Sequence, residues 1–482
     1  MFILSDPLLD MRFSDYGIQI PIRDQRAQAV LEHISRVWAG PSSCVFNLRA
    51  AADLLGIPDE DRGIHREDLE RVHDKSFVEA LFSEKLDAEL IKTYELIDER
   101  GQPRRYRPDL AVRPLSALFE TILNQVWGTY LACRLALELS SSACQGPTNA
   151  GPGFAYFLGG GMHHARRDSG SGFCLVNDIM IAVKRLMAEG KVSSVWIIDL
   201  DAHKGDGTAE LAAGNSSIRT LSIHMASGWP LDEESLTHAV AGRAPLVPSD
   251  VEIPIPRSGE ASYVPLLRSG LAELEALSQG RKPDLAIVVD GADPYEKDEL
   301  PSTADLKLSL KTCVERDRLV YDFLRERHIT SAWLMAGGYG ERAWEPPAHF
   351  LASLVRPVAA AILEQDGKVL IARRAPGQKQ AGLWEFPGGK LEAGETPEQC
   401  LEREITEELG VKIKVGPFFA ENLYSYRSGT IRLMAYRARV LGGQLRLAVH
   451  SEVRWVSPLE LLQHELSPAD VKIARLLAGE PL

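Results

Sequence analysis

Two acidic side chains and a histidine follow directly after the apolar run 195–198. The run reads Val-Trp-Ile-Ile, and residues 199–203 continue as Asp-Leu-Asp-Ala-His. In an extended segment, side chains two apart share a face, so Asp199, Asp201 and His203 line up on one side. Asp201 and His203 are a partial ligand set for an ion of the Zn²⁺ type, which favours carboxylate and imidazole donors. The alternative at this point is that the carboxylates cap the helix that follows.

A pair of adjacent histidines lies on a glycine-rich stretch nearer the N-terminus. Residues 159–164 read Gly-Gly-Gly-Met-His-His, and a second glycine-rich turn precedes Phe173. One imidazole of such a pair can act as a general base and the other as acid or electrostatic partner, if a carboxylate orients each ring. His163 and His164 are therefore candidate catalytic groups. The alternative is a loop pair without a chemical role.

Two further apolar runs also end in a polar side chain. Segment 284–293 ends at Asp293, and segment 331–340 ends in Gly-Gly-Tyr339-Gly. A site of two aspartates and one histidine leaves metal positions open for water and substrate. A metal there lowers the pKa of the water and polarises a carbonyl, and a tyrosine hydroxyl could stabilise the oxyanion. The constellation describes metal-dependent hydrolysis of an amide.

Placing these side chains together requires a particular kind of sheet. Buried parallel strands read as continuous apolar runs, and open α/β sheets bind ligands at the carboxyl ends of their strands. The apolar runs above fit this pattern. The spacing of apolar residues also predicts a long amphipathic helix over 114–140 and another over 64–83.

The first 350 residues or so resemble the histone deacetylase family, which has an arginase-like open parallel sheet with helices on both faces. The GFC and GGY motifs are most similar to its class IV and bacterial members. The resemblance implies a zinc-dependent deacylase acting on an acetyl-lysine-like or small acylated amine substrate. The implied roles are zinc binding by Asp201, His203 and Asp293, catalysis by His163 and His164, orientation of these rings by Asp199 and Asp206, polarisation of the acyl carbonyl by Tyr339, and channel walls from Gly172 and Phe173.

The chain also departs from the family pattern. Lys204 follows the histidine at 203, where many relatives have another histidine. Pro301 stands near the position of a glycine in the loop that follows Asp293, and Met162 precedes the histidine pair. We expect these departures to affect substrate preference more than the metal site.

A second group of acidic residues lies near the C-terminus. Residues 397–409 predict a helix with Thr396 as N-cap, a proline at its first position and Gly410 as C-cap. Within it, Glu404, Glu407 and Glu408 fall at i, i+3 and i+4, and therefore on one face. Such a face is either a site for a hard cation such as Mg²⁺ or Mn²⁺, or a solvated acidic surface.

This segment resembles the Nudix box at every fixed position. The matching residues are Gly389, Glu395, Arg403, Glu404, Ile405, Glu407, Glu408, Gly410 and Val411. The resemblance implies a small α/β/α sandwich that hydrolyses nucleoside diphosphate derivatives. The implied roles are metal binding by Glu404, Glu407, Glu408 and the Gly388 carbonyl, bracing of the loop by Arg403 with Glu395, catalysis involving Glu404, and a further metal-binding or basic role for Glu452.

Segment 382–390, GLWEFPGGK, is similar to MutT-type and cytidine-triphosphate pyrophosphohydrolase-type enzymes. The resemblance places Arg374 near the phosphate or sugar and Asp470, in LSPAD, at the base. Relatives specific for oxidised guanine carry asparagine there. An ionised aspartate accepts hydrogen bonds, and the cytosine amino group donates them. We therefore expect CTP, dCTP or a modified cytosine nucleotide as substrate.

Prolines 346, 347 and 357 surround a short helical pattern, and we predict a boundary between domains 1–355 and 356–482. The formal net charge of -13 argues against a protein that coats DNA. No apolar run is long enough to span a membrane, and the start of the chain lacks the pattern of a signal peptide. The six scattered cysteines (44, 133, 144, 174, 313 and 400) favour reduced thiols in a cytoplasmic protein.

Two enzyme classes are thus expected in one chain, which predicts a bifunctional hydrolase. The alternative is that only the second domain is catalytic and the first is a binding or regulatory module. A further hypothesis is that both domains act on one acylated cytosine nucleotide.

Overall fold

The computed structural model describes residues 1–40, 43–98, 100–141, 152–231, 246–392, 394–426 and 429–480. The chain divides into two compact units, of which the first consists mainly of residues up to Phe350 and the second mainly of residues from Leu351 onward. The boundary predicted after residue 355 stays a prediction. No helix in the described ranges has the length and apolar character needed to cross a bilayer. Five of the cysteines are described, all of them buried and outside any disulfide, and Cys144 lies outside these ranges.

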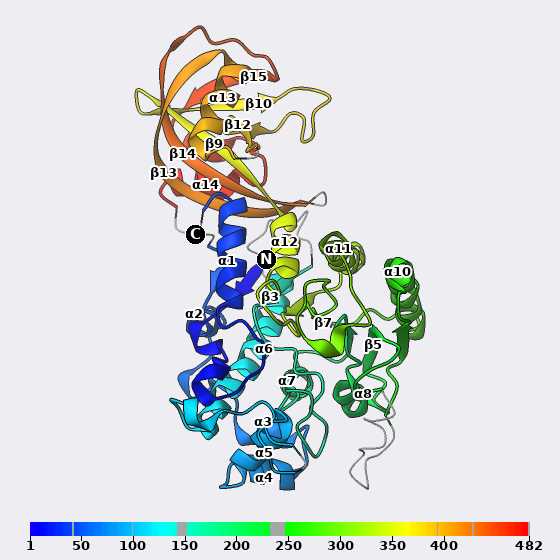
Figure 1. Ribbon diagram of the computed structural model, residues 1–482. Helices are drawn as coiled ribbons and strands as arrows, with labels where there is room; N and C mark the ends of the chain where they lie inside the picture. The colour runs from blue at the N-terminus through cyan, green and yellow to red at the C-terminus, as the bar shows by residue number, and fades with distance from the viewer. Residues whose placement is uncertain are drawn as a thin grey trace. The chain divides into compact units, whose positions relative to one another are not determined.

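The first unit is built on an eight-stranded sheet (Figure 1). Its order is β2-β1-β3-β8-β7-β4-β5-β6, and all its strand pairs are parallel. The strands are β1 (Phe2–Leu4), β2 (Val45–Phe46), β3 (Phe154–Phe157), β4 (Val195–Asp199), β5 (Ile218–Met225), β6 (Val251–Ile255), β7 (Leu285–Val289) and β8 (Ser331–Leu334). The predicted open parallel sheet is confirmed.

The order of the central strands decides where the polar strand ends meet. Strands β8, β7 and β4 are neighbours although they are far apart in sequence. All residues of these three strands are buried, as their apolar runs predict. Because parallel strands share their direction, the segments that follow them emerge at one edge of the sheet.

The helices described within residues 1–354 are α1 (Arg26–Val37), α2 (Leu48–Leu54), α3 (Arg66–Glu70), α4 (Lys75–Leu81), α5 (Leu86–Thr93), α6 (Leu118–Ser141), α7 (Asp178–Ala188), α8 (Asp206–Ala212), α10 (Glu260–Leu277), α11 (Leu310–Glu326) and α12 (Glu345–Leu354) (Figure 1). Among them, α2, α6, α8 and α10 contact strands of this sheet. The helix predicted over 114–140 is confirmed as α6, which packs on β3 and β8, while α10 packs on β5 and β6.

The single helix predicted over 64–83 is wrong. The segment forms two short helices, α3 and α4, that are separated at residues 71–74. The break has a tertiary cause: the buried His73 ring bonds the Arg166 carbonyl through Nδ1 at 2.8 Å and the Asn177 amide through Nε2 at 3.1 Å. Hydrogen bonds to distant backbone outweigh the local helical pattern here.

The second unit contains a seven-stranded mixed sheet. Its strands are β9 (Val355–Gln365), β10 (Lys368–Arg374), β11 (Trp384–Glu385), β12 (Gly388–Lys390), β13 (Val411–Tyr426), β14 (Gly429–Gly443) and β15 (His450–Val456). The path is β11-β10-β9-β14-β13, with β12 added on β9 and β15 on β10. Two helices, α13 (Pro397–Leu409) and α14 (Val471–Leu477), accompany it.

The two faces of this sheet bury separate cores. Along β9, Ala359, Ala361 and Leu363 join a cluster with Leu401 and Ile405 of α13. The alternate β9 positions 360 and 362 join a cluster with residues 473 and 474 of α14. Side chains of a strand alternate between faces, so the predicted α/β/α sandwich follows from one alternating apolar strand.

Candidate active sites

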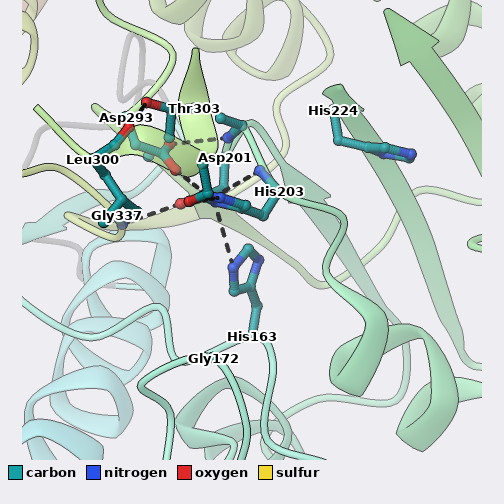
Figure 2. A network of polar contacts seen from close by, with 12 residues as sticks. His163, Gly172, Asp201, His203, His224, Asp293, Leu300, Thr303 and Gly337 are labelled. Carbon is teal, nitrogen blue, oxygen red and sulfur yellow. Dashed lines mark hydrogen bonds and ion pairs between the residues drawn. The ribbon is translucent and has the colours of Figure 1, made fainter. Parts of the chain in front are cut away.

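Three buried side chains meet at the carboxyl edge of the parallel sheet. Asp201, His203 and Asp293 each offer a ligand atom, and these atoms all lie within 4.8 Å of one another (Figure 2). His203 Nδ1 lies 2.9 Å from Asp293 Oδ2 and 3.2 Å from Asp201 Oδ1. The structure thus brings together the three residues that were predicted as zinc ligands.

The electrostatics of this trio fit a cation. Burial alone lowers the pKa of His203, but its hydrogen bonds to the two carboxylates outweigh this and raise the pKa to about 10. Burial and the charge of Asp201 raise the pKa of Asp293 to about 7. Buried carboxylates need a compensating positive charge, which protons supply here and a divalent ion would supply better. The donor set, two oxygens and one nitrogen, suits such an ion.

Backbone and loop contacts hold the trio in place. The Ala202 amide donates to Asp293 Oδ1 at 2.9 Å, and the Gly337 amide to Asp201 Oδ2 at 3.2 Å (Figure 2). A Cβ added at Gly337 would overlap the Asp201 carboxylate, so this position requires glycine. Ser302 Oγ lies 3.0 Å from His203 Nε2 and fixes the far side of that ring. Sequence reasoning missed Ser302, which lies in the loop after Asp293.

The predicted histidine pair lies beside the trio. His163 Nδ1 is 2.7 Å from Asp199 Oδ2, and His164 Nδ1 is 2.8 Å from Asp206 Oδ1. His163 Nε2 faces the trio, 3.8 Å from Asp201 Oδ1 (Figure 2). The geometry therefore supplies one orienting carboxylate for each ring, as the general acid–base hypothesis requires.

The two rings differ in their electrostatics. Burial lowers the pKa of His163, but Asp199 and Asp201 together raise it to about 9. Burial and then the charge of His163 lower the pKa of His164 to about 4. Opposite pKa shifts in adjacent groups are typical of an acid–base pair.

Tyr339 is buried near the trio. Burial, and then the charges of Asp293 and Asp201, raise the pKa of its phenol well above the ordinary value, which keeps the hydroxyl protonated. Its backbone N–H donates to Asp298 Oδ2 at 2.7 Å. Asp298 Oδ1 accepts from the Leu300 amide and the Thr303 hydroxyl at 2.9 and 3.0 Å. Asp298, another residue missed from sequence, ties the loop after Asp293 to the tyrosine.

Aromatic rings surround the approach to these groups. Phe173 meets Tyr339 edge-on at 6.3 Å between ring centroids, and Trp229 meets His164 edge-on at 4.5 Å. Gly172 has φ +56, and a Cβ there would overlap Trp229 and His164. Gly172 and Phe173 line the cavity beside the trio, and their role as channel walls stays a prediction. Trp229 was missed because nothing in its local sequence distinguishes it from a core tryptophan.

A cavity of about 490 Å³ adjoins the trio and reaches toward the N-terminal segments. The Arg26 guanidinium lines it, and donates to the carbonyls of Met335, Ala336 and Gly338 at 2.8, 2.7 and 3.0 Å. Among the described residues, no carboxylate forms an ion pair with Arg26. Its positive charge is available to an anion in the cavity.

The structure also shows the surroundings of the three residues that depart from the family pattern. Lys204 is buried and forms an ion pair with Glu252, which His224 Nε2 approaches at 3.2 Å. Pro301 begins a short 3-10 helix that carries Ser302. The Met162 amide donates to Asp178 Oδ1 at 2.6 Å and secures the glycine-rich loop.

The acidic helix of the second unit matches its prediction. α13 spans Pro397–Leu409, Thr396 accepts the Gln399 amide, and Gly410 has φ 71. Arg403 donates to both Glu395 oxygens at 2.9 Å and to Glu404 Oε1 at 2.8 Å. The predicted brace between Arg403 and Glu395 is therefore present in the geometry.

The acidic face of α13 contains an orphaned buried oxygen. Glu408 Oε2 is buried and has no hydrogen-bond partner. Burial, with further contributions from Glu404 and Glu385, raises the pKa of Glu408 to about 7, and the Gly388 backbone contacts its carboxylate. A Cβ at Gly389 would overlap the Glu404 carboxylate, so β12 approaches the helix closely. Glu407 is more exposed, at 62% of its side chain. A buried carboxylate oxygen without a hydrogen-bond partner, next to the backbone of β12, fits a divalent cation.

Glu452, for which a further metal-binding or basic role was expected, lies on strand β15 and not on α13. The pairing of β10 with β15 shifts at Arg373/Arg374, so Glu452 opposes Arg373 and His450 opposes Arg374. Arg454 Nε donates to Glu452 Oε1 at 2.6 Å. His450, which sequence reasoning missed, is buried and contacts Glu385 at 3.1 Å through Nε2. The metal-binding or basic role of Glu452 stays a prediction that this geometry does not support.

Two predicted substrate contacts lie near Glu385. Arg374 forms an ion pair with Glu385 and donates to the Lys379 carbonyl at 2.6 Å. Asp470 Oδ1 accepts the Phe386 amide at 3.0 Å. Burial, and then the charge of Glu385, raise the pKa of Asp470 well above its ordinary value. Burial therefore opposes ionisation of Asp470, whereas the role expected at the base requires an ionised acceptor, and that role stays a prediction.

Comparison with known proteins agrees with this geometry. A model of the histone deacetylase domain matches residues 20–352, and a model of the NUDIX domain matches residues 354–477. The chain belongs to the histone deacetylase family. It carries a NUDIX domain after the deacetylase domain, and both are hydrolase families.

Three relatives resemble one or the other of the two domains. The NUDIX domain is 43% identical over 116 residues to CTP pyrophosphohydrolase of Escherichia coli, which covers 24% of this chain and 86% of that one. It is 38% identical over 133 residues to Putative 8-oxo-dGTP diphosphatase 2 of Mycobacterium tuberculosis, covering 25% of this chain and 90% of that one. The deacetylase domain is 28% identical over 278 residues to Histone deacetylase 2 of Arabidopsis thaliana, covering 56% of this chain and only 64% of that relative.

Proposed function

We propose that the protein is a bifunctional hydrolase. The deacetylase domain removes an acyl group from an acetyl-lysine-like or small acylated amine with the help of Zn²⁺. The NUDIX domain hydrolyses a nucleoside triphosphate to the monophosphate and pyrophosphate with Mg²⁺ or Mn²⁺, with CTP or dCTP favoured. The observation that carries the proposal is the buried trio Asp201, His203 and Asp293, which lies beside two histidines that are each oriented by a carboxylate.

The side chains of the deacetylase domain have separate roles in the reaction. Zn²⁺ held by the trio would acidify a water molecule and polarise the acyl carbonyl. One imidazole of the histidine pair accepts the proton of the attacking water, and the pair returns a proton to the departing amine. The protonated Tyr339 hydroxyl donates to the oxygen of the acyl group as negative charge develops. Phe173 and Trp229 hold the alkyl stem and exclude water. The C–N bond breaks, and the products are a carboxylic acid and a free amine.

We expect Arg26 to bind the acid product. Arg26→Met removes the guanidinium from the cavity, and one charge-assisted hydrogen bond corresponds to about 10- to 100-fold in affinity. Inhibition of deacylation by acetate should weaken by this factor, which an inhibition series would measure. The matched control is Arg113→Met, because Arg113 lies over Tyr16 and does not line the cavity. Equal acetate inhibition in wild type and Arg26→Met would contradict this assignment.

The NUDIX domain would hold its metal between α13 and the start of β12 at Gly388. Glu404, Glu407 and Glu408 supply carboxylates, and Arg403 with Glu395 keeps the loop in position. A divalent ion held there would supply charge neutralisation at the phosphates and activation of water. Asp470 would meet the base, and Arg374 with Glu385 lies beside it. The similarity to a CTP pyrophosphohydrolase supports a cytosine nucleotide.

Asp470→Asn tests the choice of base. The variant replaces a carboxyl group by an amide, which changes one hydrogen bond to the base, worth about 1–3 kcal/mol. We expect kcat/KM for CTP and dCTP to fall at least about tenfold relative to an oxidised guanine nucleotide. Asp366→Asn, in an exposed turn of the same domain, is the control. An unchanged ratio between the nucleotides would remove Asp470 from base recognition.

A split assay on the purified chain tests the whole proposal. An acetyl-lysine fluorogenic peptide is offered with Zn²⁺, and a panel of nucleoside triphosphates with Mg²⁺, scored by pyrophosphate release. Activity in both arms is expected. Nucleotide cleavage with no zinc bound at the trio would show that the deacetylase domain is a non-catalytic module.

A further inference from the structure

Arg316 on α11 is a fully buried guanidinium directly behind the trio, with a relative exposure of 0%. Its Nη1 donates to the carbonyl oxygens of Leu200 at 3.1 Å and Gly291 at 2.9 Å. Leu200 immediately precedes Asp201, and Gly291 lies two residues before Asp293. One nitrogen thus connects the two backbone segments that present the two carboxylates.

The carbonyls of Leu200 and Gly291 lie just beyond the last hydrogen bond between β4 and β7. The ladder between β4 and β7 ends at the pair Asp199 and Val289, and the Leu200 amide adds one last bond to the Val289 carbonyl at 3.0 Å. Beyond that point the carbonyls of Leu200 and Gly291 meet Arg316. A buried carbonyl without a partner is costly, so loss of the guanidinium would move both segments toward other partners.

Carboxylates keep the guanidinium in this orientation. Arg316 Nη2 donates to Asp290 Oδ1 at 2.7 Å, and Nε donates to Asp317 Oδ1 at 2.6 Å. The Tyr156 hydroxyl donates to the other Asp290 oxygen at 2.6 Å. Buried ion pairs contribute little to stability compared with apolar packing of the same volume, whereas the rigid planar fork of arginine is well suited to holding several acceptors at fixed positions.

We propose that Arg316 is a positioning residue for the metal site: it sets the separation of the Asp201 and Asp293 carboxylates by holding the Leu200 and Gly291 carbonyls on one guanidinium. This inference rests on the proposed function, because it requires that the trio binds a divalent ion. Groups that support ligands typically change metal affinity by 10- to 100-fold when they are removed.

The test uses the full chain and Zn²⁺ itself. The dissociation constant is measured by competition with a chromophoric chelator, and the zinc lost in Asp201→Ala defines the site. In Arg316→Lys we expect the dissociation constant to rise about 10- to 100-fold. Saturating Zn²⁺ should restore deacylation, which an unfolded domain could not do, and nucleotide cleavage should stay at the wild-type rate.

Arg185→Lys is the matched control. Arg185 lies on α7 and donates to two backbone carbonyls, Gly63 at 2.8 Å and Asp61 at 3.1 Å. Neither carbonyl adjoins the trio, so this variant should lose stability without a change in zinc affinity. The comparison separates positioning of ligands from the general cost of removing a buried arginine.

The outcomes are distinguishable. Absence of zinc binding in wild type overturns the proposed function itself. Zinc binding in wild type with an equal dissociation constant in folded Arg316→Lys overturns only the role of Arg316. If Arg316→Lys does not fold, the zinc dissociation constant is measured in Asp290→Asn instead. This variant keeps Arg316 and removes the carboxylate that orients it. A severalfold weaker affinity supports the inference, and an unchanged affinity overturns it.

Discussion

Asp201→Ala is expected to abolish deacylation and zinc binding at the trio while nucleotide cleavage continues at the wild-type rate. Asp201 is 2% exposed and its ligand oxygen lies within 4.8 Å of the ligand atoms of His203 and Asp293, so its removal leaves the trio with two ligands. A catalytic metal contributes several kcal/mol of transition-state stabilisation, which corresponds to a loss of about 10³-fold or more. Zinc content and the rate on the acetyl-lysine peptide are the measurements.

Asp250→Ala is the control for this prediction. Asp250 belongs to the same domain and bonds Arg219 at 2.7 Å and the Thr220 amide at 2.9 Å. It precedes β6, at the end of the parallel sheet opposite to the trio. This variant should keep its zinc and its deacylation rate. Wild-type deacylation by Asp201→Ala would show that the trio is not the catalytic metal site.

The second large effect is expected for Glu408→Gln, which should remove pyrophosphate release and leave deacylation unchanged. The substitution preserves the shape of the side chain but removes the charge next to the unpartnered buried oxygen. A neutral amide is a poor ligand for Mg²⁺, so the rate at a fixed Mg²⁺ concentration should fall by about 10²- to 10³-fold. Pyrophosphate release from CTP across a Mg²⁺ series measures this loss.

Glu402→Gln provides a matched control on the same helix. Glu402 is exposed and lies away from the face of Glu404 and Glu408, so its substitution should not change the Mg²⁺ dependence. An unchanged Mg²⁺ dependence in Glu408→Gln would assign the acidic face of α13 to solvent. If either Asp201→Ala or Glu408→Gln removes both activities, the two domains depend on each other.

Local patterns in the sequence were sufficient to predict those strands and helices whose formation depends on a short stretch of the chain. The apolar runs before Asp199, Asp293 and Tyr339 predicted three buried strands, because only strands buried on both faces read as continuous apolar segments. The helix 397–409 could be predicted with both caps, since Thr396 and Gly410 act on backbone within one turn.

Local patterns did not predict the structure correctly where contacts with residues far away in the sequence determine it. The predicted helix over 64–83 is broken because the His73 ring bonds backbone groups about a hundred residues away. The role expected for Glu452 came from the resemblance to MutT-type members, and it stays a prediction. The structure pairs Glu452 with Arg373 beside a shift of register between β10 and β15, which the local sequence does not record.

By itself, therefore, the sequence indicated the two hydrolase families, the three strand ends and the acidic helix face, because these depend on residue type and short spacing. Only the tertiary structure decided that β8, β7 and β4 are neighbours, which brings Asp201, Asp293 and Tyr339 to one edge. It also decided that Ser302, Trp229, Arg26 and Arg316 surround that edge. Their contacts join segments that are far apart along the chain, and a single sequence records spacing along the backbone but not proximity across a packed core.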